Sequence, residues 1–140
     1  GMRIGFCIGN EKLIHYLNDV KFSFNSYTMN LPSQVMGVEA VKDDVYFKET
    51  TAKIVATRER IKKELSQLGF TFPDSKANFI FASHKEVPAE ELFLALRAAD
   101  IYVRHWNKER IANSLRISVG TDEEMDRLIA FLKEYLEKRA

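Results

Sequence analysis

One arginine lies where a predicted strand would expose it to a polar surface. Polar and apolar residues alternate over 114–119. In a strand this places Leu115, Ile117 and Val119 on one face and Arg116 on the other. A guanidinium fixed on a strand can hold a carboxylate or phosphate through two parallel hydrogen bonds. An ion pair with a neighbouring Asp or Glu explains the same residue, and spacing alone favours that structural alternative.

Two further positions have side chains suited to binding. Asn78 opens an apolar segment, where its amide can face a cleft at the end of a strand or simply form a turn. Arg104, His105 and Trp106 combine a cation, a titratable ring and an indole, a set that can line a pocket for a ring-bearing anion. The alternative is one aromatic anchor in a surface loop.

Other kinds of chemistry lack a signal in the sequence. The chain has neither common form of glycine-rich phosphate loop, and no local signature of a nucleophilic serine or cysteine. His15 and His84 are isolated, so no metal site is predicted. Cys7, the only cysteine, falls in an apolar segment and reads as a buried, inert thiol.

Composition narrows the class of protein. The 140 residues are 46% hydrophobic and 29% charged, as is usual for globular proteins, and the formal net charge is only +1. This balance gives no reason to expect nucleic acid or an anionic membrane as a partner. Because one cysteine cannot form an intramolecular disulfide, and no secretory signal or long apolar run is found, we expect a cytoplasmic protein.

The first half of the chain is predicted to contain one long helical region. The expected order is a buried strand over Met2–Ile8, a short helix over Glu11–Leu17, an aromatic loop over Lys21–Leu31 and helix from Ser33, as N-cap, to Gly69. This last region is one helix or two in tandem, with a weak point near residues 48–51. A helix so much longer than the ~11–12 residue mean usually joins two bodies.

The second half is predicted to be a small mixed domain. It contains strands over 78–83, 101–104 and 114–119, a helix from Pro88 to Ala99 and a last helix opened by a Thr121–Glu124 capping box. This order indicates an α/β (α+β) fold: a small two-layer domain whose mostly antiparallel sheet is covered by helices. The long helix and the N-terminal strand, which has no evident partner, precede it.

Three ordered stretches resemble one family of enzymes. They are Gly1-Met2-Arg3-Ile4-Gly5-Phe6, Ser75-Lys76-Ala77-Asn78-Phe79 and, most specific, Asn113-Ser114-Leu115-Arg116-Ile117-Ser118-Val119-Gly120. They are similar to segments of fold-type-I, pyridoxal-phosphate-dependent aminotransferases of the histidinol-phosphate type. The resemblance covers essentially the whole chain and implies a C-terminal portion, with residues 1–32 from the large cofactor-binding domain and 33–140 from the linking helix and small domain.

The resemblance also implies roles for single residues. Arg3 matches an arginine that contacts the cofactor phosphate, Arg116 the arginine that binds the substrate carboxylate, and Asn78 a strand entry near the substrate cleft. The Schiff-base lysine would precede Gly1, so no catalytic residue is assigned here. The parent family uses pyridoxal phosphate, which this chain alone is not expected to bind.

Three hypotheses about function stay open. The chain can be an inactive fragment of an enzyme that transfers an amino group between an amino acid such as histidinol phosphate and a 2-oxo acid. It can instead be a non-enzymatic module that forms a homo-oligomer through its first strand or long helix. It can also be one half of a split enzyme whose partner chain supplies the large domain.

Overall fold

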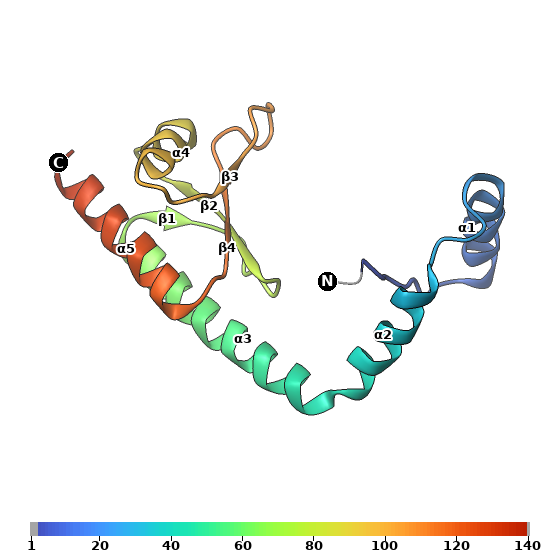
Figure 1. Ribbon diagram of the computed structural model, residues 1–140. Helices are drawn as coiled ribbons and strands as arrows, with labels where there is room; N and C mark the ends of the chain where they lie inside the picture. Colours follow the sequence, from blue (N-terminus) through green and yellow to red (C-terminus); the bar gives the residue numbers. More distant parts are fainter. Residues whose placement is uncertain (1–2, 140) are drawn as a thin grey trace. The chain divides into compact units, whose positions relative to one another are not determined.

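The computed structural model describes residues 3–139, which form five helices and one four-stranded sheet (Figure 1). The chain separates into two compact units, Gly1–Lys48 and Glu49–Ala140. The division falls near the start of a helix that contributes to both. The boundary between residues 32 and 33 stays a prediction.

The first unit contains two helices and the first residues of a third. A loop over residues 3–10 precedes α1 (Glu11–Phe24), which is followed by α2 (Leu31–Lys42) and the beginning of α3 (Asp44–Gln67). The strand predicted for 2–8 does not form over residues 3–8, and Met2 lies outside the described residues. A strand needs a neighbour for its backbone groups, and segment 3–8 pairs with no described strand.

Asparagine and aspartate side chains set the helix ends in this unit. Asn30, not Ser33, is the N-cap of α2, since its Oδ1 accepts a hydrogen bond from the Ser33 backbone N–H at 2.8 Å. The break between α2 and α3 lies at Asp43, earlier than the predicted weak point. There the Asp43 Oδ1 accepts from the Tyr46 N–H at 3.1 Å, which starts the new helix. The predicted loop over 21–31 is also shorter, because α1 continues to Phe24.

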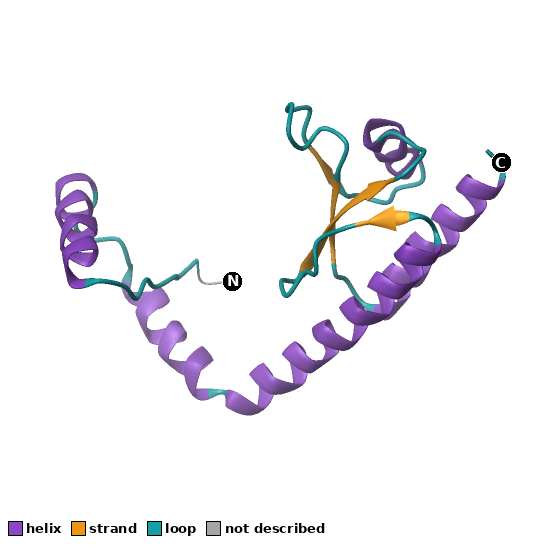
Figure 2. Ribbon diagram, turned by 180° about the vertical axis from the view of Figure 1, so that it is seen from behind, coloured by secondary structure: helices purple, strands orange, loops and turns teal. Residues whose placement is uncertain are grey.

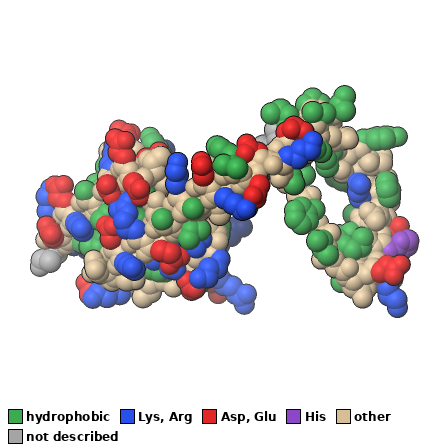
Figure 3. All heavy atoms as spheres, turned by 90° about the horizontal axis from the view of Figure 1, so that it is seen from below, with side chains coloured by type: hydrophobic (Ala, Val, Ile, Leu, Met, Phe, Trp, Pro, Cys, Tyr) green, Lys and Arg blue, Asp and Glu red, His purple; other side chains and the backbone are tan. Residues whose placement is uncertain are grey.

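The first unit exposes much of its apolar surface. No residue of α1 is buried, and Phe6, Phe24 and Tyr27 are each at least 90% exposed. Cys7, expected to be buried, is exposed as well. Figure 3 shows the hydrophobic side chains on the surface of this part of the chain, whereas charged side chains predominate on the other part.

The second unit is built on an antiparallel sheet. After α3 come β1 (Phe70–Thr71), β2 (Phe79–His84), α4 (Ala89–Ala98), β3 (Arg104–His105), β4 (Leu115–Ser118) and α5 (Asp122–Glu137). The strand order is β1-β2-β4-β3 and every pair is antiparallel (Figure 2). β1 was not among the predicted strands. β3 spans 104–105 instead of the predicted 101–104, because pairing to β4 reaches only those two residues.

Helices cover one face of this sheet. Buried residues of α3, α4 and α5 form a single core with those of β2 and β4, including Ile61, Leu65, Leu92, Leu96, Leu128, Leu132, Ile80 and Ile117. On β2 and β4 the buried positions alternate with partly exposed ones. The predicted two-layer fold is therefore confirmed, and the side chains on the other face of the sheet are partly exposed.

Candidate binding site on the open face of the sheet

Two arginines lie side by side on the open face. In the sheet register Arg104 of β3 is opposite Arg116 of β4, and Arg116 is in turn opposite Phe81 of β2. Residues directly opposite across antiparallel strands project from the same face, and like charges there repel. Two adjacent arginines are therefore stable only when other groups offset the repulsion between their positive charges.

An indole provides part of that compensation. The guanidinium carbons of Arg104 and Arg116 each lie 5.5 Å from the ring centroid of Trp106. Arg116 is also 5.6 Å from the Phe79 ring, and Phe81 is 6.4 Å from Trp106. Aromatic faces attract cations at these distances. These contacts stabilise both arginines on this face of the sheet.

A carboxylate partner is missing from this cluster. Within residues 3–139 neither Arg104 nor Arg116 forms an ion pair, and the buried Nε of Arg116 has no hydrogen-bond partner. The structural alternative for Arg116, an ion pair with Asp or Glu, is thus not what the structure shows. Two adjacent unpaired guanidiniums suit an anion that accepts several hydrogen bonds, such as a carboxylate or phosphate.

His105 belongs to the scaffold and not to the arginine cluster. Its Nε2 lies 2.7 Å from the Ala112 carbonyl oxygen, and its ring is 5.6 Å from Phe93 of α4. The loop that follows is tied back to α4 because Asn113 Oδ1 accepts from the Ala89 N–H at 3.1 Å. The three-residue cluster predicted from the sequence is therefore divided: Arg104 and Trp106 meet Arg116, whereas His105 holds the loop.

Asn78 immediately precedes the first residue of β2 and is exposed. Its carbonyl oxygen accepts from the Val119 N–H at 2.9 Å, which joins it to the end of β4. It is three positions before Phe81, the residue paired with Arg116, which is roughly 10 Å along a strand. Asn78 is therefore at the edge of the site and does not contact Arg116 in this structure.

Lys62 and Asp74 fix the loop that leads to Asn78. The Lys62 Nζ lies 2.5 Å from Asp74 Oδ1. The hydrogen bond from Lys62, and then that from Lys76, lower the pKa of the Asp74 carboxyl to about 2. Asp74 is therefore ionised at any physiological pH, and the loop start stays fixed to α3.

Arg3 belongs to the first unit, whereas Arg116 belongs to the second. It is exposed, has φ 59° and lines an open cavity of about 730 Å³. Apolar side chains, including Ile4, Phe6, Met29 and Val41, make most of the other walls. A phosphate site needs several converging donors. The other donors that line this cavity, Gln34 and Lys42, are bound to the Met29 carbonyl oxygen and to Glu39. By themselves the described residues around Arg3 therefore do not fit pyridoxal phosphate.

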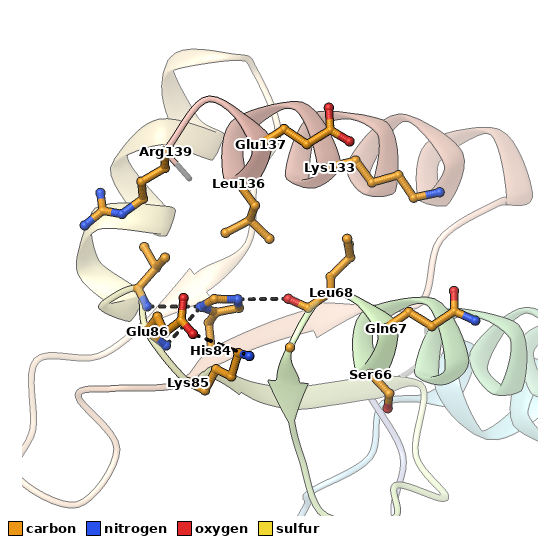
Figure 4. Close-up of a pocket in the computed structure, with 12 residues that line it drawn as sticks. Ser66, Gln67, Leu68, His84, Lys85, Glu86, Lys133, Leu136, Glu137 and Arg139 are labelled. Atoms are coloured by element: carbon orange, nitrogen blue, oxygen red, sulfur yellow. Dashed lines mark hydrogen bonds and ion pairs between the residues drawn. The ribbon is translucent and has the colours of Figure 1, made fainter.

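A second hollow, between α3, β2 and α5, is lined by a histidine whose ring nitrogens both face backbone groups of the chain (Figure 4). Its volume is about 520 Å³. The buried His84 accepts the N–H groups of Glu86 and Val87 at Nδ1, and its Nε2 lies 2.8 Å from the Leu68 carbonyl oxygen. With both nitrogens engaged, His84 fixes this turn and is not available for catalysis.

The described part of the chain shows neither a metal site nor a membrane-spanning helix. Among residues 3–139 no group of three or more His, Cys, Asp and Glu side chains is arranged to hold a metal ion. In the same range no helix combines the length and apolar character needed to cross a bilayer.

Phe79 and Phe81 were not singled out from the sequence. Side chains alternate between the two faces along β2, so Phe79 and Phe81 lie on the face away from the buried Ile80 and Ala82. This alternation can be read from the sequence. Their neighbours on β4 and β3 depend on register, which residue spacing does not give.

Comparisons with known proteins show the family to which this chain belongs. A sequence profile of the family described as aminotransferase class I and II matches residues 1–132. The histidinol-phosphate aminotransferase of Brachyspira hyodysenteriae is 50% identical over 133 residues, which are 95% of this chain and 38% of that protein. The chain thus spans well under half the length of this curated relative.

Solved structures show the same fold. Histidinol-phosphate aminotransferase from Clostridium acetobutylicum matches 85% of this chain and 37% of its own, with a TM-score of 0.74 and 21% identity. The enzyme from Sinorhizobium meliloti, solved in complex with pyridoxal-5'-phosphate, matches 88% of this chain and 34% of its own, with a TM-score of 0.71 and 25% identity. The chain therefore belongs to the class I and II aminotransferase family, whose members use pyridoxal phosphate, as its three motifs predict.

Proposed function

We propose that this chain provides the acid-binding part of an aminotransferase that exchanges an amino group between a substrate such as histidinol phosphate and a 2-oxo acid. The observation that carries the proposal is the unpaired pair Arg104 and Arg116, held over Trp106 at 5.5 Å. Histidinol phosphate presents a phosphate and a 2-oxo acid presents a carboxylate. Two adjacent guanidiniums suit either group.

Each residue then has a defined task. Arg116 binds the acid group through paired N–H donors, and Arg104 adds a second positive charge beside it. Trp106 keeps both side chains in place and covers one side of the acid group from water. Arg3 contacts the cofactor phosphate together with donors outside these 140 residues, and Asn78 lies at the edge of the substrate cleft.

The cofactor supplies the carbonyl chemistry that accepts and returns the amino group. The described residues do not form a cofactor site on their own, so no step of that chemistry is assigned to them. The matched relative is much longer, since this chain covers only 38% of it. We therefore expect the 140-residue polypeptide alone to bind anions without catalysing transamination.

A chimera tests this proposal. Residues 1–132 would replace the matching segment of the Brachyspira hyodysenteriae enzyme, and transamination of histidinol phosphate by 2-oxoglutarate would be measured. The chimera should be active, and the same chimera with Arg116→Ala should lose most activity. The separate 140-residue polypeptide should show no turnover and no cofactor absorbance after dialysis. An inactive but folded chimera, or an active separate polypeptide, would contradict the proposal.

A second candidate function is self-association. The specific observation is the exposed apolar surface of the first unit, where Phe6, Phe24 and Val41 are 90%, 91% and 84% exposed. Apolar surface in water costs about 25 cal/mol per Å², so a second copy of the chain can cover it favourably. The same surface also suits a partner chain that carries a large domain.

Light scattering over a range of concentrations separates these possibilities. Self-association predicts a mass that rises with concentration and falls back to that of a monomer in Val41→Glu. A monomer at every concentration would rule out the homo-oligomer. Capture of a large-domain chain by this monomer would then favour the split enzyme.

A further inference from the structure

A buried arginine on α3 has no role in the site described so far. Arg58 is only 5% exposed, although it is charged. It follows Ile54 by four residues and precedes Ile61 by three, so it falls on the apolar stripe of its helix. Burying a guanidinium is costly unless its donors are satisfied, so its partners show what it stabilises.

The partners of Arg58 are a loop and one carboxylate. Its Nη1 donates to the Ala77 carbonyl oxygen at 3.1 Å, and its Nε donates to Glu59 Oε1 at 3.0 Å. The pKa of the Glu59 carboxyl is lowered, first by the hydrogen bond from Lys62 and then by that from Arg58. The carboxylate thus stays charged and fixes one side of the guanidinium.

The loop that Arg58 holds leads directly into the arginine site. Within it, Ser75 Oγ donates to the Phe79 carbonyl oxygen at 2.5 Å and accepts from the Ala77 N–H at 3.2 Å. Phe79 follows Asn78, and its ring lies 5.6 Å from the Arg116 guanidinium. A shift of Ala77 would therefore move Asn78 and the ring against which Arg116 rests.

We propose that Arg58 is a positioning residue that fixes the 75–78 loop and thereby the acid-binding geometry of Arg116. This inference rests on the proposed function, because it assumes that Arg116 binds an acid group. Arg58 itself lies on α3, and its hydrogen bonds go to Ala77 and Glu59, not to the arginine cluster. Its effect is transmitted through the Ala77 carbonyl and the Phe79 ring.

The 140-residue chain contains its own probe for this idea. Trp106 is the only tryptophan and lies against Arg116, so inorganic phosphate bound there should change its fluorescence. Titrations at constant ionic strength would compare the unchanged chain with Arg58→Met and Arg58→Lys. Methionine keeps the length and apolar stem of arginine but removes the donors, and lysine keeps the charge.

Arg60→Met is the matched control. Arg60 lies two residues along α3 and pairs with Glu64, Asp122 and Asp126, so its loss destabilises the same unit without touching the 75–78 loop. Arg58→Met should weaken phosphate binding about tenfold, as expected for one misaligned charge-assisted hydrogen bond, with partial rescue in Arg58→Lys. Arg60→Met should bind as the unchanged chain does.

The outcomes separate the two proposals. If the unchanged chain shows no phosphate response, or Arg116→Ala responds equally well, the proposed function fails. If the unchanged chain binds and Arg58→Met and Arg58→Lys both bind equally well, the positioning role is refuted. If Arg58→Met does not fold, Arg58→Lys decides: weaker binding with shifted Asn78 and Phe79 amide resonances supports the role, and unchanged binding and resonances refute it.

Discussion

The replacement of Arg116 is the sharpest test of the binding site. We consider Arg116→Lys and Arg116→Ala in the 140-residue chain, with inorganic phosphate as the ligand. Arg116 is half-buried on β4 and has no ion pair among the described residues, so its substitution breaks no carboxylate contact. A change in affinity then reports on the bound anion.

The expected magnitude follows from the contacts. A hydrogen bond to a charged group contributes about 1.5–3 kcal/mol, which corresponds to a roughly 10- to 150-fold change in the dissociation constant. Arg116→Ala should reach the upper part of this range, because the charge and both donors are removed. Arg116→Lys keeps the charge but loses the planar fork, so its effect should be about tenfold.

Trp106 fluorescence is the assay, with ionic strength held constant so that screening does not imitate binding. Arg97→Ala is the matched control: Arg97 is an exposed arginine in the last turn of α4, a helix on the covered face. It loses the same charge and should change affinity less than twofold, about the size of a remote surface effect.

One pattern of results would refute the reasoning. If Arg116→Ala and Arg97→Ala weaken phosphate binding equally, the affinity depends only on the net charge of the chain. The open face of the sheet would then not be a specific acid-binding site. Equal affinity of Arg116→Lys and the unchanged chain would show that paired donors are not needed.

Three further predictions concern stability. Gly69→Ala should lower the free energy of unfolding by about 1–2 kcal/mol in urea titrations, because φ is +86° there. Gly5→Ala, where an added Cβ meets open space, should change the free energy of unfolding little, and equal effects of the two substitutions would contradict the strain argument. Thr121→Ala should cost about 1 kcal/mol in the same titrations by removing the capping box of α5; an unchanged midpoint would show that water replaces the cap. Thermal stability should fall as pH decreases from about 3.8 to about 2, because the Lys62 hydrogen bond lowers the pKa of Asp74 and stabilises the fold only while this carboxyl is ionised. Asp74→Asn should reduce this loss of stability in acid.

Much of the second unit could be predicted from the sequence. The capping box at Thr121, the Gly69 stop and the alternation around Arg116 are local signals, and each predicted element is present. Local signals failed where an element depends on a neighbour. The segment at residues 3–8 has strand composition but no paired strand, and β1 forms only because it pairs with β2.

The candidate site divides in the same way. Spacing put Arg116 on a polar face, and motif resemblance suggested its role, but spacing favoured an ion pair that the structure does not contain. Arg104 and Trp106 were interpreted as lining a pocket for a ring-bearing anion or as part of a surface loop, with no indication that they meet Arg116. Arg58 was missed, although its place on an apolar stripe between Ile54 and Ile61 was a usable signal.

By itself the sequence determined the family, the capping box that starts α5 and the face on which Arg116 lies, because motifs, caps and alternation involve residues close together in the chain. Only the tertiary structure decided the strand register, and with it the pairing of Arg104 with Arg116 and their stacking on Trp106. Register depends on contacts between distant segments, and a shift of one residue would turn every side chain to the other face.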